Sequence, residues 1–115
     1  MTNYNELSDF EINKRVVEYD FEGIFTIERD PSSSSCVLVF YPDDMSGRYV
    51  DYCNRWGDIG PIIERDNICL QSPVMNSEWY ACDIEDLTLS EHKNPKRAAA
   101  ICYLMMKDLE NDQES

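Results

Sequence analysis

Two strand-like runs decide the fold of this chain: IFTIER at residues 24–29 and CVLVFY at residues 36–41. Both runs are rich in β-branched and aromatic residues, which pack well on the pleated surface of a sheet. The segment DPSSSS at residues 30–35 lies between them and has the composition of a flexible polar connector. Together the three segments predict a β-hairpin.

A helix is predicted on the N-terminal side of the hairpin, over residues 9–19. Ser8 and Glu11 have the spacing of a capping box, in which a serine side chain satisfies a backbone N–H at the start of a helix. Leu7 and Ile12 occupy the positions of a hydrophobic staple, an apolar contact across the same helix start. Both signals place the beginning of the helix at the same point.

A second helix is predicted near the C-terminal end. Asn94 and Pro95 are a strong start signal, because asparagine caps helices and proline is tolerated at the first helical position. Apolar residues then recur every three or four positions as far as Leu109, which is typical of an amphipathic helix. We expect residues 111–115 to form a frayed tail.

Shorter elements are expected between these helices. The sequence predicts a short strand over residues 48–53, a short helix capped by Asp58, and a strand pair over residues 68–71 and 78–84. Closely spaced strands favour antiparallel pairing with helices on one face. The prediction is therefore one α+β domain over residues 1–115, with a small antiparallel sheet packed against an N-terminal and a C-terminal helix.

Negative charge dominates the composition. The 23 Asp and Glu residues exceed the 10 Lys and Arg residues, which gives a formal net charge of −13 on 115 residues. Because such a polyanion repels nucleic acid and anionic lipid, direct binding to either is not expected. No apolar run approaches the ~20 residues that span a bilayer. The N-terminus lacks a signal-peptide pattern, so we expect a cytoplasmic protein.

The cysteines give no metal or redox motif. Cys36, Cys53, Cys69, Cys82 and Cys102 are widely spaced and form no CxxC pair. Most have apolar neighbours, which is typical of small buried thiols in a reducing compartment. We expect no metal and no other cofactor.

Catalytic chemistry has little support in the sequence. A nucleophilic cysteine or serine needs a histidine within hydrogen-bond reach, and His92 is the only histidine. We expect His92 in a charged loop. The four glycines form no phosphate-binding loop. We therefore predict that the protein is not an enzyme.

Two groups of acidic residues could gather into a stripe that imitates DNA towards a basic protein. The first group consists of Asp43, Asp44, Asp51, Asp58, Glu64 and Asp66, and the second of Glu78, Asp83, Glu85, Asp86 and Glu91. Averaged over the whole surface, the charge density falls about fivefold short of duplex DNA, so mimicry requires clustering. The alternative is a dispersed acidic surface that keeps the protein soluble.

Aromatic and arginine residues at positions 49–56 allow two interpretations. Tyr52, Arg55 and Trp56 are residue types that form binding hot spots at protein interfaces, but they could equally pack in the core, with Trp56 closing it. Combined with the first acidic group, they complete the predicted partner-binding set: Asp43, Asp44, Asp51, Tyr52, Arg55, Trp56, Asp58, Glu64 and Asp66.

One basic island interrupts the acidic chain. Lys93, Lys96 and Arg97 surround the start of the last helix, where backbone N–H groups also favour anions. They could bind phosphate or a nucleotide. The alternative is that they neutralise the acidic segment at residues 83–91.

Several blocks of the sequence point to a known family. They are YNELSDFEIN at residues 4–13, DYCN at 51–54, PIIE at 61–64, NI at 67–68, NP at 94–95, RAA at 97–99 and LMM at 104–106. In this order they resemble the NinX-like proteins of lambdoid phages and prophages, and the resemblance covers most of the chain. The hairpin at residues 24–44 resembles the family least, and WGDIG at residues 56–60 departs from it. The resemblance implies a small phage accessory protein in the bacterial cytoplasm, with no described function and no catalytic residues to carry over.

The leading hypothesis is therefore a non-enzymatic phage accessory protein that binds and modulates a host or phage protein with a basic surface. An anti-defence inhibitor and a DNA mimic are the specific forms of this hypothesis. The alternative is a small-anion or nucleotide binder, which includes an enzyme, at Lys93, Lys96 and Arg97. A third hypothesis is self-association through the apolar end of the last helix at Met105 and Met106. The sequence does not predict the oligomeric state.

Overall fold

The computed structural model describes residues 3–73, 75, 77–83 and 88–114. Within these residues the helices are a short 3-10 turn (Tyr4–Glu6), α1 (Asp9–Asp20), α2 (Trp56–Arg65) and α3 (Pro95–Glu114). The strands are β1 (Thr26–Arg29), β2 (Val37–Tyr41), β3 (Ser46–Val50), β4 (Cys69–Gln71), β5 (Trp79–Cys82) and β6 (Leu89–His92). The α+β class is confirmed.

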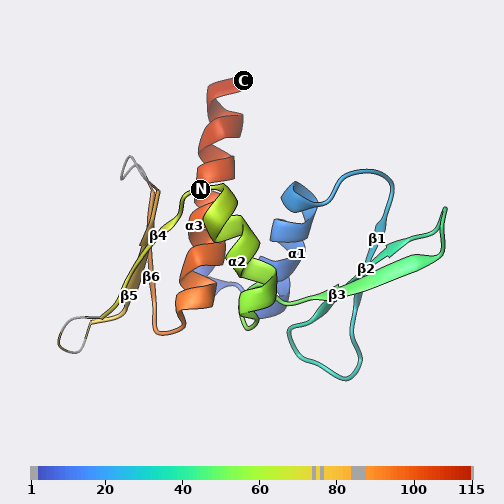
Figure 1. Ribbon diagram of the computed structural model, residues 1–115, viewed down its shortest axis with the longest axis horizontal. Coiled ribbons are helices and arrows are strands. Elements are labelled where there is room, and N and C mark those ends of the chain that lie inside the picture. Colours follow the sequence, from blue (N-terminus) through green and yellow to red (C-terminus); the bar gives the residue numbers. More distant parts are fainter. Residues whose placement is uncertain (1–2, 74, 76, 84–87, 115) are drawn as a thin grey trace.

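The strands form two sheets, with the helices between them (Figure 1). Sheet A has the order β1-β2-β3 and sheet B the order β4-β5-β6, and every pairing is antiparallel. Sheet A packs against α1, while α3 packs against sheet B, α1 and α2. The expected single sheet is thus divided in two, because the chain leaves sheet A after β3 and enters α2 before it reaches β4.

The start of α1 confirms the predicted capping signal. The Oγ of Ser8 accepts a hydrogen bond from the backbone N–H of Glu11 at 3.2 Å, and the helix begins at the next residue after Ser8. Ile12, Val16 and Val17 of this helix are completely buried. The helix therefore supplies an apolar face that sheet A covers.

Sheet A contains the predicted hairpin. In its register, Val39 of β2 lies opposite Ile27 of β1 and Arg48 of β3. Val37 and Val39 are completely buried and face α1, so successive side chains of β2 alternate between this inner face and the opposite, outer face. Leu38 and Phe40 therefore lie on the outer face.

The start of α2 corrects the sequence prediction. The helix begins at Trp56, two residues before Asp58, and its N-cap Arg55 makes no capping hydrogen bond through its side chain. The Asp58 carboxylate instead accepts a hydrogen bond from the backbone N–H of Asp51 at 2.9 Å and pairs with Arg48 at 3.3 Å. The predicted role of Asp58 as helix cap was wrong because its carboxylate holds the end of β3.

Sheet B contains one strand that the sequence analysis missed. The predicted strand pair appears as β4 and β5, but β6 adds a third strand that includes His92, which we expected in a loop. Residues 89–92 read LSEH and lack the β-branched and aromatic residues that mark a strand. Two of the predicted strand's residues, 83 and 84, lie beyond the end of β5, and residue 84 is outside the described residues.

The start of α3 is predicted correctly and its end is not. The Oδ1 of Asn94 accepts the backbone N–H of Lys96 at 3.0 Å, and the helix begins at Pro95. It continues to Glu114, four residues into the expected tail. Residues 98–104 are all buried, because sheet B and the other two helices surround this part of α3. None of the helices within the described ranges is both long enough and apolar enough to cross a bilayer.

Candidate functional site

Two of the predicted partner-binding residues are in the core. Asp51 is 5% exposed and Tyr52 is 2% exposed, so neither is available to a partner. The hydroxyl of Tyr52 donates a hydrogen bond to Asp20 at 3.1 Å. Burial, and then the Asp20 carboxylate, raise the pKa of Tyr52. The core alternative is therefore correct for Tyr52, and a partner-binding role was wrong for both residues.

Asp51 is the centre of a buried polar network. Its carboxylate accepts hydrogen bonds from Asn13 at 2.8 Å, from Ser35 at 2.6 Å and from Asn54 at 3.1 Å. Asn13 also donates to the backbone carbonyl of Ser35 and accepts from the backbone N–H of Cys53 at 3.1 Å. Because leaving any of these buried groups unpaired costs about 1–3 kcal/mol, the network fixes α1 to the segments that flank sheet A.

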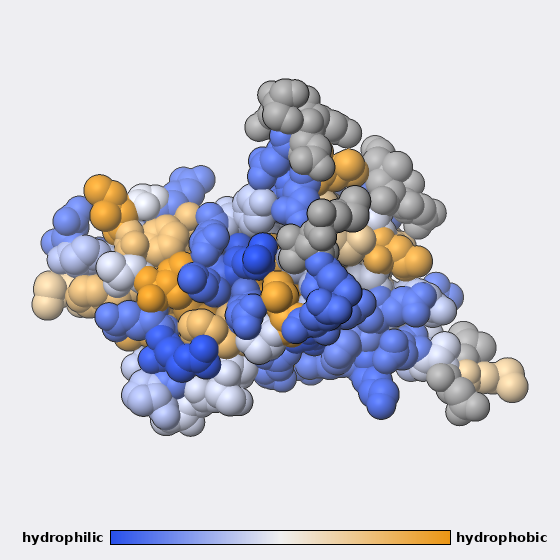
Figure 2. Space-filling view, turned by 180° about the vertical axis from the view of Figure 1, so that it is seen from behind, coloured by the Kyte–Doolittle hydropathy of each residue, from blue (hydrophilic) through white to orange (hydrophobic). Residues whose placement is uncertain are grey.

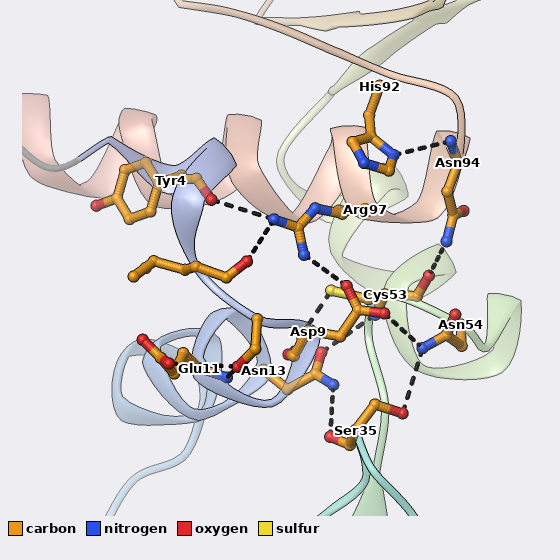
Figure 3. Close-up of polar contacts among 12 residues, drawn as sticks. Tyr4, Asp9, Glu11, Asn13, Ser35, Cys53, Asn54, His92, Asn94 and Arg97 are labelled. Carbon is orange, nitrogen blue, oxygen red and sulfur yellow. Dashed lines mark hydrogen bonds and ion pairs between the residues drawn. The ribbon is translucent and has the colours of Figure 1, made fainter.

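Arg97 extends this network to the start of α3 (Figure 3). Its guanidinium is 6% exposed, pairs with Asp9, and donates to the backbone carbonyls of Tyr4 at 3.2 Å and Leu7 at 2.7 Å. The side chain of Asn94 donates to the carbonyl of Cys53. We refer to the whole network as the polar clamp, formed by Asp9, Asn13, Ser35, Asp51, Asn54, Asn94 and Arg97.

The polar clamp corrects the anion-binding interpretation of the basic island as it applies to Arg97. Three of the guanidinium's interactions are with the N-terminal segment, so Arg97 does not present its charge to an external anion. Its ion-pair partner is Asp9, in the N-terminal segment. Lys93 is exposed, and the Nζ of Lys96 lies 4.7 Å from the centre of the Trp56 ring. The island thus keeps two lysines at the surface.

Trp56 does not close the core, as one interpretation held. It lies at the first position of α2 with 50% of its surface exposed, and Arg55 before it is exposed too. The ammonium of Lys96 above the indole ring makes a cation–π contact, which at an exposed site is worth about 0.5–1 kcal/mol. The contact links the start of α2 to the start of α3.

The first acidic group does not form one exposed stripe. Asp51 belongs to the polar clamp, the side chain of Asp58 is 10% exposed, and Asp66 is paired with Arg65 at 2.9 Å. Glu64 is exposed on α2, whereas Asp43 and Asp44 are exposed in the turn between β2 and β3. The group is therefore divided between the core, α2 and sheet A.

The second acidic group can be described only in part, because Glu85 and Asp86 lie outside the described residues. Glu91 is exposed on β6, and Glu78 is partly buried. The carboxylate of Asp83 accepts a hydrogen bond from the backbone N–H of Thr88 at 3.3 Å. Of the three described members, Glu91 alone is fully at the surface.

The outer face of sheet A is a surface that the sequence analysis missed. Leu38 of β2 lies opposite Tyr49 of β3, and Phe40 lies opposite Gly47. A Cβ atom at Gly47 would be 3.3 Å from Cδ1 of Leu38 and 3.6 Å from Cδ2 of Phe40. The glycine therefore leaves space that the side chains of Leu38 and Phe40 occupy, and Tyr49, which is 50% exposed, lies opposite Leu38 on the same face.

No helix among the described elements packs on this outer face. The helix α1 lies on the inner face, where Val37, Val39 and Val50 are completely buried. Met45, at 77% exposure, lies in the adjoining turn. In the space-filling view, apolar residues form a broad patch over the end of the molecule that holds sheet A (Figure 2). Exposed apolar residues that gather on one face make it a candidate interaction surface.

Acidic side chains lie beside the outer face. Glu28 lies opposite Leu38 in the register and therefore shares its face, and Asp43 and Asp44 are exposed in the adjoining turn. The strands of sheet A contain two bases, Arg29 and Arg48. Both lie opposite the buried inner-face valines. Arg29 stacks on the ring of Phe10 at 3.9 Å, and Arg48 pairs with Asp58, so both basic groups are directed to the inner side.

A signal for this face was present in the sequence. The run VLVFY at residues 37–41 is apolar at every position and does not alternate with polar residues. A strand with one solvated face normally alternates, so a continuous apolar run in an antiparallel hairpin indicates two apolar faces. Only one of these faces is covered by a helix within the described structure.

The structure also has a surface pocket of about 290 Å³ between α1 and α3, lined by Tyr4, Arg15, Glu18, Tyr19, Leu104 and Asp108. The hydroxyls of Tyr4 and Tyr19 both donate to the Asp108 carboxylate. Burial and these hydrogen bonds raise the pKa of both tyrosines. The two tyrosine hydroxyls and the Asp108 carboxylate are thus hydrogen-bonded to one another. No group of three or more potential metal ligands occurs in the part of the chain that the structure describes.

Comparison with known proteins gives one family. The family model described as bacteriophage P22 NinX matches residues 3–107. No curated protein and no solved structure matches the chain. The family match includes the polar clamp and both sheets. The chain therefore belongs to the phage NinX family, as the resemblance in the sequence implied.

Proposed function

We propose that this NinX-family member is a non-enzymatic accessory protein that binds a host or phage protein through the outer face of sheet A. The observation that carries the proposal is an apolar surface without a covering helix among the described elements, formed by half-buried Leu38 and Phe40 and exposed Tyr49, with the carboxylates of Glu28, Asp43 and Asp44 beside it. The partner that fits presents apolar residues together with Lys or Arg. The interaction takes place in the bacterial cytoplasm.

The apolar residues supply the affinity in this proposal. Sheet A has three strands about 4.8 Å apart, and its two longer strands have five residues with a rise of about 3.4 Å per residue. The face is therefore about 17 Å by 14 Å. A specific interface buries about 800 Å² on each partner, so the partner must also cover the flanking turn with Met45. Tyr49 is the strongest candidate for a hot spot, because tyrosine is enriched among residues that dominate binding energy.

The carboxylates supply association rate and specificity. Glu28, Asp43 and Asp44 lie at the edge of the apolar centre, where charges remain solvated and contribute little net affinity. The net charge of −13 steers a basic partner towards the protein and repels nucleic acid. Among the specific roles, an inhibitor of a defence or nucleic-acid-handling factor fits this chemistry. An inhibitor of this kind does not require carboxylates arranged with the spacing of DNA phosphates.

The thiols and the histidine support a non-enzymatic role. Burial raises the pKa of Cys53, and it raises the pKa of Cys102 to about 11, so both thiols are protonated at neutral pH and are poor nucleophiles. The Nδ1 of His92 accepts the backbone N–H of Asn94 at 2.9 Å, which engages one ring nitrogen inside the fold. We do not propose the alternative nucleotide site, because the guanidinium of Arg97 is already engaged in the polar clamp.

The proposal is tested by affinity capture from host lysate, with and without phage infection, at low and at moderate ionic strength. The wild type is compared with Tyr49→Ser and with Trp56→Ser, a matched control, since both aromatic residues are 50% exposed. We expect Tyr49→Ser to lose a protein that the wild type and Trp56→Ser retain, and moderate salt to weaken its capture. The same set of retained proteins for wild type and Tyr49→Ser would overturn the proposal.

A further inference from the structure

Two cysteines face each other across neighbouring strands of sheet B. Cys69, the first residue of β4, is the register partner of Cys82, the last residue of β5. All five cysteines are thiols in the structure. From the sequence we expected all five to be buried. That expectation was wrong for Cys69, which is exposed, and Cys82 is half-buried.

Both thiols lie on the face of sheet B that points away from α3. Ala81 is completely buried against α3, so the next residue, Cys82, points to the opposite side of the strand. The third strand, β6, supports this orientation, because Leu89 is the register partner of Cys82 and is 53% exposed. Since directly opposite residues share a face, Cys69 lies on this side as well.

The backbone geometry suits a disulfide between them. Directly opposite residues in an antiparallel pair have Cα atoms about 4.5–5.5 Å apart. Disulfides span Cα separations of about 4.4–6.8 Å, so the strands need no large movement. The strand β4 has three residues and lies at the edge of its sheet. It can therefore shift slightly so that the two sulfur atoms reach bonding distance.

We propose that Cys69 and Cys82 form a thiol pair that a low-molecular-weight disulfide, such as oxidised glutathione, converts into an intramolecular disulfide. The Cys69 thiolate attacks one sulfur of oxidised glutathione, which gives a mixed disulfide and releases one glutathione thiolate. The Cys82 thiolate then attacks the Cys69 sulfur and releases the second glutathione thiolate. The two cysteines lose two electrons and two protons, and the oxidant leaves as two molecules of reduced glutathione.

The other three cysteines differ from this pair. Cys36, Cys53 and Cys102 are at most 1% exposed, and burial raises the pKa of each thiol. Because Cys69 is the exposed thiol, it should react first with the oxidant. Cys82, its neighbour on β5, should then be the thiol that attacks the mixed disulfide. The disulfide would join β4 to β5 and stabilise sheet B without touching the outer face of sheet A.

The test treats the folded, full-length protein with oxidised glutathione and analyses it by mass spectrometry before and after reduction. For the wild type we expect a disulfide between the peptides that contain Cys69 and Cys82, a raised Tm, and reversal by a reductant. Cys82→Ser should retain one glutathione on Cys69, because the second step lacks its nucleophile. Cys69→Ser, at an exposed position, should take up none and form no disulfide.

Cys36→Ser is the matched control and should form the same disulfide as the wild type. A disulfide that includes any of the three buried cysteines would overturn the proposal. So would a wild type that stops at the mixed disulfide, as the Cys82→Ser variant does, or one that does not react. These readouts are independent of any binding partner, so they do not depend on the function proposed for sheet A.

Discussion

The polar clamp and the outer face of sheet A use their residues in opposite ways. In the clamp, the polar and charged groups of Asn13, Asp51 and Arg97 are buried, and hydrogen-bond partners come from distant parts of the chain. On the outer face, apolar residues such as Tyr49 are at the surface and the carboxylates beside them are exposed. Residue type alone therefore predicts the wrong location for both regions. Charged side chains that could bind a partner, such as Arg97, are buried in the fold, and apolar side chains that could pack in the core, such as Tyr49, are exposed to solvent.

The comparison also divides the chain by its resemblance to the family. Residues of the clamp come largely from blocks that resemble NinX proteins, namely residues 4–13, 51–54, 94–95 and 97–99. Leu38 and Phe40 of the outer face lie in the hairpin at residues 24–44, the part that resembles the family least, whereas Tyr49 follows it in β3. This division fits a shared scaffold, held by the clamp, that carries a recognition surface of its own.

The largest effect is expected from breaking the clamp at Arg97. Arg97→Met leaves the Leu7 carbonyl without its partner and removes one of the two partners of Asp9 and of the Tyr4 carbonyl, which should lower the free energy of unfolding by about 3–5 kcal/mol. Urea denaturation followed by circular dichroism measures this change. The control is Arg65→Met, because Arg65 forms exposed ion pairs with Asp20 and Asp66 that are worth at most about 1 kcal/mol. Equal losses for the two variants would contradict a structural role of the clamp.

A slightly smaller effect is expected at Asn13. Asn13→Ala removes a donor from the Asp51 carboxylate and an acceptor from the backbone N–H of Cys53, and all three groups are buried. The loss should be about 2–3 kcal/mol, because each unsatisfied buried group costs about 1–3 kcal/mol and water can reach part of the gap. Asn54→Ala, at an exposed residue, should cost less. The opposite order in urea denaturation would show that Asp51 depends on Asn54 instead.

Neighbouring residues of β2 distinguish the two faces of sheet A. Val39→Ala creates a cavity in the core and should cost about 1–3 kcal/mol, whereas Leu38→Ala on the outer face should cost less than about 1 kcal/mol. Leu38→Ala should nevertheless weaken capture of the partner. Thermal unfolding of the two variants measures the difference. A greater destabilisation by Leu38→Ala would mean that the outer face is covered in the free protein.

Alkaline pH should destabilise the core through its tyrosines. Burial and the nearby Asp20 carboxylate raise the pKa of Tyr52, and they raise that of Tyr103 to about 12, above the unfolded value of about 10. The folded protein therefore holds the phenolic protons more tightly than the unfolded chain does. This contribution is complete below about pH 10 and is lost as the pH rises through the folded pKa.

Urea midpoints measured at increasing pH should fall above about pH 10, and Tyr52→Phe should fall less steeply than the wild type, because phenylalanine has no proton to lose. The wild type and Tyr52→Phe are compared at the same ionic strength. Parallel pH profiles for the two proteins would contradict the coupling between Tyr52 and Asp20.

The sequence predicts elements that carry strong local signals. Ser8 and Glu11 locate the start of α1, Asn94 and Pro95 locate the start of α3, and the two apolar runs locate the hairpin. It does not predict β6, whose residues favour no structure locally and join sheet B through pairing with β5. Such tertiary pairing has no signature in a short window of sequence.

The site was harder to predict because burial is a property of the whole fold. Nothing local distinguishes Asp51, which is enclosed by the polar clamp, from Asp43, which is exposed in a turn two residues after β2. Arg97 likewise looks like one member of a basic island until the N-terminal segment folds over it. Conversely, the apolar outer face was indicated by the missing alternation in β2, a local pattern that could have been interpreted.

The account is tested most directly by hydrogen–deuterium exchange on the complex with the captured partner. We predict slower exchange in β2, β3 and the turn between them, and unchanged exchange at the starts of α2 and α3, where Trp56 and Lys96 lie. Slower exchange confined to the starts of α2 and α3, with the hairpin unchanged, would contradict the assignment of sheet A as the binding surface.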